Sequence, residues 1–198
     1  MQKGDATRER IKKASLGLFH KKGYGSTSIN HVLDSSGIKK GTFYFHYPSK
    51  EKLAVDVLDK ALAKYEIQIN EPIGHLPPSD QIMAVVEAIV GYHIEDGTSK
   101  GCLFGNMALE MGKNGTQVAA FVEKVFDDWV IRFEKLLKKA VENNEITLKE
   151  SPLAFSRTII ALIQGGLVLS KISGNPDALI DCKKSIMALM RDRKIKKS

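Results

Sequence analysis

The sequence predicts an all-α protein of about nine helices, with an amino-terminal helix-turn-helix domain of three helices followed by a larger helical domain. Apolar residues recur mostly at steps of three and four, which is the period of an α-helix. No sustained apolar–polar alternation indicates strands. Glycine, proline and asparagine pairs separate the helical segments. The expected helices span about residues 7–22, 28–35, 39–47, 49–69, 80–95, 102–111, 114–142, 152–172 and 177–192.

The first three helices have clear ends. Gly23 stops the first helix, and Thr27 or Ser28 caps the second, because either hydroxyl can accept a hydrogen bond from a free helix amide. Gly37 lies in the turn before the third helix, since glycine tolerates a left-handed backbone. Pro48 ends the third helix. Two short helices separated by a glycine turn fit a helix-turn-helix.

The fourth helix is long enough to connect two parts of the molecule. Ser49 caps it, and Glu51 lies in its first turn, where the helix dipole favours an acidic side chain. The helix continues to about Ile69, a length of about 30 Å. Three prolines and a glycine then interrupt the chain. We expect one domain over residues 1–48, a second over residues 49–198, and a connecting helix over residues 49–70.

The fifth to seventh helices contain many methionine and aromatic side chains. Such stripes are usually core, but these side chains also adapt to irregular apolar ligands. Asn106 and Glu110 are polar groups that can orient a ligand, although a solvent-facing or hydrogen-bonded core position is the simpler interpretation of each. The residues expected to line an effector pocket are Tyr92, Phe104, Met107, Met111, Phe126, Trp129, Phe133 and Gln164.

The eighth helix is apolar nearly all round, so it must be buried on more than one face. Together with the ninth helix, over residues 152–192, it predicts a homodimer in which two helices from each chain form a four-helix bundle. Gly165 and Gly166 would allow close approach there. The alternative is burial within one chain. The stretch from Leu153 to Leu169 is expected to be too short and too polar to span a membrane.

Positive charge is concentrated at the amino-terminal end. Residues 1–52 contain eleven Lys/Arg and four Asp/Glu, whereas residues 53–198 contain nineteen of each. A basic end on a neutral body indicates a polyanion such as nucleic acid, with solubilising surface charge as the alternative. The first residues are polar and charged, so no signal peptide is expected. Cys102 and Cys182 form no cluster, so we expect a cytoplasmic protein without disulfides.

The third helix has a composition suited to the major groove, where a recognition helix contacts base edges. Lysines can meet phosphates or guanine, a glycine allows close approach, and a threonine can contact a base or a thymine methyl. Phe43 is expected to anchor the helix to the core. The alternative is an ordinary aromatic core helix. The candidate DNA-contacting residues here are Lys39, Lys40, Gly41, Thr42, Tyr44, His46 and Tyr47.

The motif GIKKGTFYFHYPSKEKL, residues 37–53, resembles the signature of the tetracycline-repressor family, roughly Gly-Val-Ser-Lys-Gly-Thr-Leu-Tyr-His-His-Phe-Pro-Ser-Lys-Glu-Glu-Leu. Residues 7–32 are similar to the family's first helix and its entry to the second. Residues 101–112 look like the sixth helix of one branch. The resemblance implies a DNA-binding repressor, a homodimer, and a helical carboxyl-terminal domain that binds a small effector.

The resemblance also implies roles for single residues. Positions that match Thr42, Tyr44, His46 and Lys50 commonly contact the operator, and the hydroxyl that matches Thr27 can bind a phosphate. Two positions depart from the family pattern. Lys39 replaces a small capping residue, so the start of the third helix is expected to be less well capped. Phe45 replaces a residue that is often more polar, so base preferences cannot be carried over.

An enzyme is the competing class, and the sequence gives it little support. The five histidines show no HExxH or other metal-ligand spacing, and neither a GxSxG nor a GxxxxGK[ST] motif is present. We therefore expect no catalytic residue, cofactor or metal. A second alternative is an architectural DNA-binding protein without an effector. The long apolar body argues against it, because bending DNA does not require such a domain.

Overall fold

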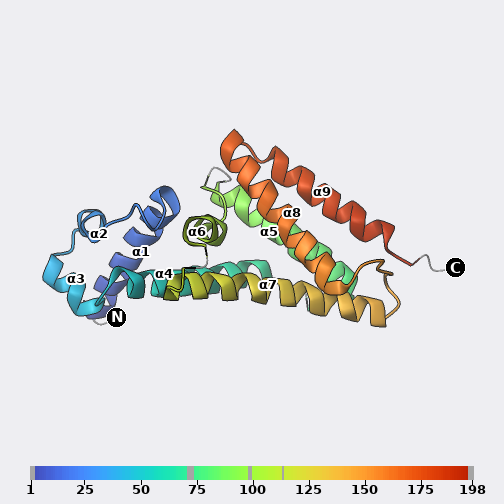
Figure 1. Cartoon of the computed structure of the whole chain (residues 1–198), viewed down its shortest axis with the longest axis horizontal. Coiled ribbons are helices and arrows are strands. Elements are labelled where there is room, and N and C mark those ends of the chain that lie inside the picture. Colours follow the sequence, from blue (N-terminus) through green and yellow to red (C-terminus); the bar gives the residue numbers. More distant parts are fainter. Residues whose placement is uncertain (1–2, 71–73, 98–99, 113, 196–198) are drawn as a thin grey trace. The chain divides into compact units, whose positions relative to one another are not determined.

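The computed structural model describes residues 3–70, 74–97, 100–112 and 114–195, and within them it contains nine α-helices and no named strand (Figure 1). The predicted all-α fold is confirmed. The helices are α1 (Lys3–Lys22), α2 (Ile29–Ser36), α3 (Lys40–His46), α4 (Lys50–Asn70), α5 (Pro78–Asp96), α6 (Leu103–Met111), α7 (Gln117–Glu142), α8 (Pro152–Ser173) and α9 (Asp177–Asp192).

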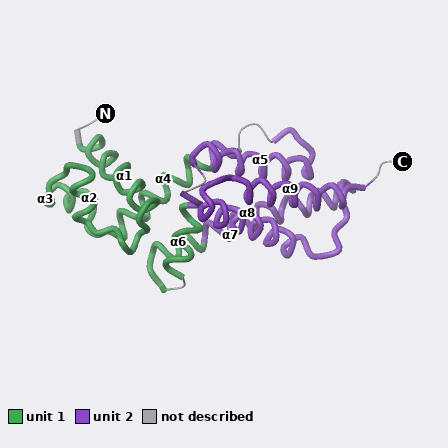
Figure 2. The backbone as a smooth tube through the Cα atoms, turned by 90° about the horizontal axis from the view of Figure 1, so that it is seen from above, with its two compact units in different colours: residues 1–65, 103–123 green, residues 66–102, 124–198 purple. Residues whose placement is uncertain are grey.

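The helices form two compact units (Figure 2). The first unit comprises residues 1–65 and 103–123, and the second comprises residues 66–102 and 124–198. α4 and α7 contribute to both units, and α6 belongs to the first unit, where it packs against α1. The two units are defined by how the helices pack. The expected boundary after residue 48 instead separates a DNA-binding part from the rest of the chain, and it stays a prediction.

Short-range hydrogen bonds explain most helix ends. The hydroxyl of Ser28, not of Thr27, caps α2: it accepts from the amide of His31 at 3.2 Å, and the His31 ring accepts from the Ser28 amide at 3.2 Å. The Ser49 hydroxyl accepts from the amide of Lys52 at 3.1 Å. These bonds satisfy amides that would otherwise lack a partner in the first turn of a helix.

Two helices begin away from their expected positions. α1 begins at Lys3 instead of Thr7. α7 begins at Gln117 instead of Asn114, because the Asn114 side chain accepts from the amide of Thr116 at 3.2 Å and holds the preceding residues in a turn. The Thr116 hydroxyl then accepts from the amide of Ala119 at 3.1 Å and caps the helix.

The first unit has a compact apolar core. Phe43, the expected anchor of α3, is fully buried, as is Val32 of α2. Each of α1, α2, α3 and α4 contributes at least one fully buried apolar side chain, so the short helices are held by packing more than by their own helix propensity. These core residues are Ile11, Phe19, Val32, Phe43, Leu53 and Leu58.

In the second unit, α8 packs along α9 of the same chain. A Cβ at Gly166 would lie 3.0 Å from the Cα of Leu179 and 3.2 Å from the Sγ of Cys182, so only glycine permits this close approach. The expectation that Gly166 serves contact between two chains is therefore wrong for this residue. Gly165, by contrast, is exposed.

The length of α8 differs from the expectation. It spans 22 residues, and its most apolar stretch has a mean hydropathy of 1.6, so by length and composition alone it could cross a membrane. By this criterion, the prediction that the segment is too short and too polar to span a membrane is wrong. However, Ile159, Ile163 and Leu167 are buried in the core, as is typical of a central helix in a globular protein.

Candidate nucleic-acid interface

The turn between α2 and α3 has the geometry of a helix-turn-helix. Gly37 ends α2 with a left-handed backbone, φ 61°, which a side chain would disfavour. Arg10 of α1 donates from Nη2 to the carbonyl oxygen of Gly37 at 3.1 Å and ties the turn to α1. Lys39, at the N-cap of α3, makes no capping hydrogen bond with its side chain, as its replacement of a small residue predicts.

One face of α3 is open to solvent. Phe43 points into the core, and the other side of the helix exposes most of the residues expected to meet DNA. His46 is half-buried, with its ring 5.2 Å from that of Phe45. The exposed residues among the predicted set are Lys39, Lys40, Gly41, Thr42 and Tyr44. Their exposure leaves them free to contact a groove, and that contact stays a prediction.

Phe45 is the most exposed large apolar side chain in the described part of the chain, at 84%, and the sequence analysis did not count it among the DNA-contacting residues. Two helical positions separate it from Phe43, a rotation of about 200°, so it points away from the core. The position of Phe45 around the helix axis relative to Phe43 was the signal in the sequence that could have identified it as exposed.

Tyr47, in contrast, does not belong to the exposed face. It is only 1% exposed, and its hydroxyl donates to Asp56 Oδ2 at 2.5 Å and accepts from Arg8 Nε at 3.1 Å. The expectation that Tyr47 offers a donor to DNA is therefore wrong, because its hydroxyl is committed to a network between α1, α3 and α4. Burial, with the hydrogen bond to Asp56, raises the pKa of Tyr47 well above its ordinary range.

We expect Tyr47→Phe to lower the free energy of unfolding by about 2 kcal/mol at neutral pH, since a hydrogen bond to a carboxylate is lost. Burial alone would raise the pKa of Asp56, but hydrogen bonds from Tyr47 and Arg8 outweigh it and bring the pKa below its ordinary value. This stabilisation is therefore complete above the unfolded pKa, about 4, and is lost as the pH falls through the folded pKa.

Chemical denaturation of the two proteins between pH 7 and pH 3 measures this effect. The difference in stability should shrink toward low pH. Tyr44→Phe is the matched control, because Tyr44 is an exposed tyrosine of α3, three residues before Tyr47, and it should change stability little. A difference that is constant with pH would contradict the proposed network.

Thr27 and Lys50 face the interior of the first unit. The Thr27 side chain is fully buried, and its hydroxyl donates to the carbonyl of Gly23 at 2.7 Å. The single hydroxyl proton is thus in use, so the expected bond from Thr27 to a phosphate would require this hydrogen bond to break. The structure places Thr27 in a supporting role.

Lys50 holds the turn between α1 and α2. Its ammonium donates to the carbonyl oxygens of Tyr24, at 2.9 Å, and of Thr27, at 3.0 Å, and lies 4.1 Å from the centre of the Tyr24 ring. Burial lowers the pKa of Lys50, although the nearby Glu110 carboxylate opposes this. A phosphate contact by Lys50 would have to use its remaining proton.

Glu110 of α6 also binds the turn between α1 and α2, through hydrogen bonds to its backbone. Its carboxylate accepts from the amide of Tyr24 at 2.8 Å and from the amide of Gly25. A Cβ at Gly25 would lie 2.6 Å from the Glu110 carboxylate, so a larger residue there would displace that carboxylate from its present position. Glu110 was considered as a polar group that orients a ligand, and it instead supports the helix-turn-helix.

The residues expected to line an effector pocket lie in both units. Phe104 and Met107 are buried in the first unit, and Met111 there is half-buried. In the second unit, Trp129 and Phe133 are buried, whereas the other three are half-buried: Tyr92, Phe126 and Gln164. A shared cavity formed by these residues stays a prediction. Within the described residues, no group of three or more His, Cys, Asp or Glu side chains could hold a metal ion.

Comparison with known proteins identifies relatives along nearly the whole chain. Residues 11–57 match the family described as "Bacterial regulatory proteins, tetR family", and residues 78–186 match "Tetracyclin repressor-like, C-terminal domain". An uncharacterised HTH-type transcriptional regulator in the lacX 3′ region of Lactococcus lactis subsp. lactis is 30% identical over 180 residues, which is 87% of each chain.

Two further proteins extend this similarity. The HTH-type transcriptional repressor DhaR of Mycobacterium sp. (strain GP1) is 25% identical over 174 residues, which is 87% of this chain and 86% of DhaR. The crystal structure of a TetR transcriptional regulator from Chloroflexus aurantiacus J-10-FL has a TM-score of 0.84 and 25% identity, and the match covers 98% of each chain.

Proposed function

Because this chain belongs to the tetracycline-repressor family of bacterial transcriptional regulators, we propose that it is a repressor that binds a palindromic operator as a homodimer and is released by a small hydrophobic effector. A relative that is itself named a repressor supports this sign of regulation. Bacterial operators lie in the cytoplasm, so we place the protein there.

The observation that carries this proposal is the open face of α3. An exposed glycine, threonine, tyrosine and phenylalanine stand beside exposed lysines on a helix whose opposite side is anchored by Phe43. Polar and apolar groups of this kind contact base edges and thymine methyls, while lysines neutralise phosphates. The positive charge of residues 1–52 adds a sequence-independent attraction to the same polyanion.

A stripe along α8 supports the dimer. Four of its exposed residues recur at steps of three and four, and the fifth lies four positions after one of them, so all five lie on one side of the helix. The two small residues at one end would allow close helix packing, and the three large ones would cover apolar surface. We propose that this stripe, with α9, forms the interface with a second copy of the chain. The stripe consists of Ala161, Gly165, Val168, Leu169 and Ile172.

Two carboxylates of the first unit support the proposal that an effector acts on the DNA-binding helices. Glu110 of α6 holds the turn between α1 and α2. Glu51 of α4 accepts from the amide of Gln117, at the start of α7, at 2.7 Å. We propose that effector binding displaces α6 and α4 and so moves α3. A roughly 150-fold loss of operator affinity requires about 3 kcal/mol of coupling.

Glu110→Gln should loosen this turn. An amide side chain keeps one acceptor oxygen and presents an N–H group to the second backbone amide, so one of the two hydrogen bonds is lost. We expect hydrogen exchange at the amides of Tyr24 and Gly25 to rise about tenfold. Glu87→Gln is the control, since Glu87 pairs with Lys183 in the second unit. Unchanged exchange in Glu110→Gln would contradict the proposed grip.

Selection of duplexes from a random DNA pool tests the function as a whole. We expect a two-fold symmetric sequence with half-sites about one helical turn apart, roughly 34–36 Å. A thermal-shift screen with apolar metabolites then searches for the effector, which should stabilise the protein by binding its folded state. Failure of the pool to yield any common sequence would contradict the proposed function.

A further inference from the structure

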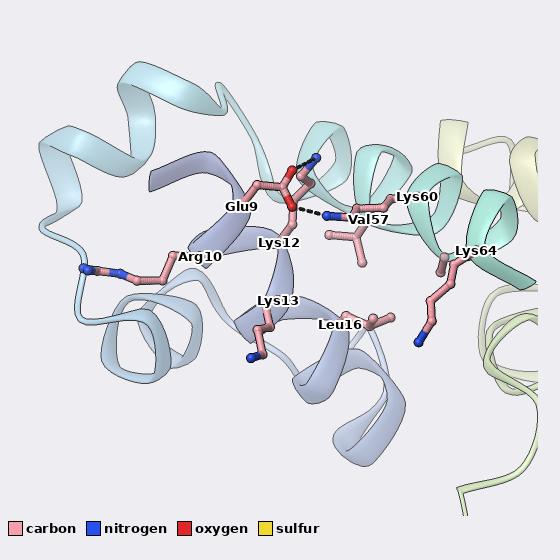
Figure 3. A pocket seen from close by; sticks show the side chains of 9 residues that line it. Glu9, Arg10, Lys12, Lys13, Leu16, Val57, Lys60 and Lys64 are labelled. Atoms are coloured by element: carbon pink, nitrogen blue, oxygen red, sulfur yellow. Dashed lines mark hydrogen bonds and ion pairs between the residues drawn. The ribbon is translucent and has the colours of Figure 1, made fainter. Parts of the chain in front are cut away.

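A groove of about 430 Å³ lies between α1 and α4 within the first unit (Figure 3). This volume is in the range of sites that bind small organic molecules. It is distinct from the exposed face of α3 and from the pocket expected in the body of the protein. The groove is lined by Glu9, Arg10, Lys12, Lys13, Leu16, Val57, Lys60, Ala61 and Lys64.

Apolar side chains form the inner part of the groove. Val57 is almost completely buried, and Leu16 and Ala61 are half-buried. In Figure 3, the Leu16 side chain lies between those of Lys13 and Lys64. An apolar chain laid along these residues would remove their remaining surface from water, which is favourable.

The rim of the groove carries an excess of positive charge. Glu9 is its only carboxylate, and it pairs with Lys12 at 2.6 Å and with Lys60. The hydrogen bonds from Lys12 and Lys60 lower the pKa of Glu9, so it stays ionised, and these two lysines share its single negative charge. Lys13 and Lys64 have no carboxylate within ion-pair distance among the described residues, so two ammonium groups remain uncompensated.

We propose that this groove binds an amphipathic anion, a carboxylate with a flexible apolar chain, whose charged head lies between Lys13 and Lys64 and whose chain covers Leu16, Val57 and Ala61. The charge of the rim and the apolar floor fit the two ends of such a molecule. A DNA backbone fits less well, because it has no apolar part to cover the floor. The site does not depend on the proposed repressor function.

Titration of the full-length protein with dodecanoate, below its micelle concentration and without DNA, tests this site. Methyl resonances of Leu16, Val57 and Ala61 should shift, while the emission of Trp129, in the second unit, should not change. Dodecanol has the same chain without the charge and should bind at least fivefold more weakly, because its uncharged head gains little from the lysines.

Two variants locate the binding. Lys13→Gln with Lys64→Gln should weaken dodecanoate binding about fivefold or more, whereas Lys135→Gln with Lys139→Gln, on the exposed face of α7, should not. Ala61→Phe should fill the groove and abolish binding. If Ala61→Phe does not fold, the double variant of Lys13 and Lys64 still tests whether dodecanoate binds in this groove.

Four results would overturn the proposal: no binding of dodecanoate at millimolar concentration, equal binding of dodecanol, shifts confined to the second unit, or equal affinity in the lysine pair and the wild type. Loss of operator affinity in the Lys13 and Lys64 pair, without any dodecanoate binding to the wild type, would assign the rim to DNA instead. Because dodecanoate binding is measured without DNA, its failure is separate from failure of the repressor function.

Discussion

Replacing both Leu169 and Ile172 by glutamate should convert the protein from a dimer to a 21.9 kDa monomer and lower operator affinity at least about 100-fold. Ile172 is 79% exposed and Leu169 is 56% exposed, so neither substitution disturbs the core of its own chain. In a dimer, however, each glutamate would bury an uncompensated charge against the partner, and a monomer contacts only one half-site. Leu167, also on α8, is buried and would be a poor choice, because its replacement would unfold the chain.

Sedimentation at micromolar concentration, together with a binding titration on the selected operator, measures both effects. Leu109→Glu is the matched control, since it puts the same charge on an exposed leucine of α6, and it should leave the dimer intact. Thermal unfolding should be two-state for both variants. A double variant that stays dimeric and binds DNA normally would show that α8 does not form the interface.

Phe45→Ala should lower affinity for the selected operator about 10- to 100-fold and remove the preference at one base pair of each half-site. The 84% exposed ring is placed to contact an apolar group in the groove, and a thymine methyl is the apolar group that the major groove offers. A contact of about 1 kcal/mol lost in each half-site is lost twice in a dimer. Stability should not fall, because the ring packs against little of its own chain.

Lys40→Ala is the companion variant for Phe45→Ala. It removes an exposed cation from the same helix, so it should weaken binding to all sequences alike and lower the salt slope by roughly one per contact. Phe45→Ala should leave the salt slope unchanged. If Phe45→Ala weakened all sequences equally, its role in base recognition would be wrong.

Much of the fold could be predicted because it depends on local signals. The spacing of apolar residues predicted the nine helices in the described part of the chain. Ser49 was recognised as a helix cap and Gly37 as the turn residue, because each of these two residues acts on its immediate neighbours in the sequence. Phe43 was recognised as the anchor because only one of two nearby phenylalanines on α3 can face the core.

The candidate interface was harder to predict because its support comes from distant residues. Tyr47 was predicted to contact DNA. Its hydroxyl instead accepts a hydrogen bond from Arg8, which lies 39 residues away in the sequence. The grip of Glu110 on Tyr24 spans 86 residues, and no local pattern indicates it. A tyrosine or glutamate has both an apolar stem and a polar end, so the sequence alone does not decide which way it points.

Binding to a symmetric operator and to the same duplex with one half-site scrambled tests the central proposal most directly. If the protein is a dimer that contacts two half-sites through α3, scrambling one half-site should lower affinity at least about 100-fold, and the intact duplex should hold two chains. Equal affinity for the two duplexes, or one chain bound per intact operator, would contradict it.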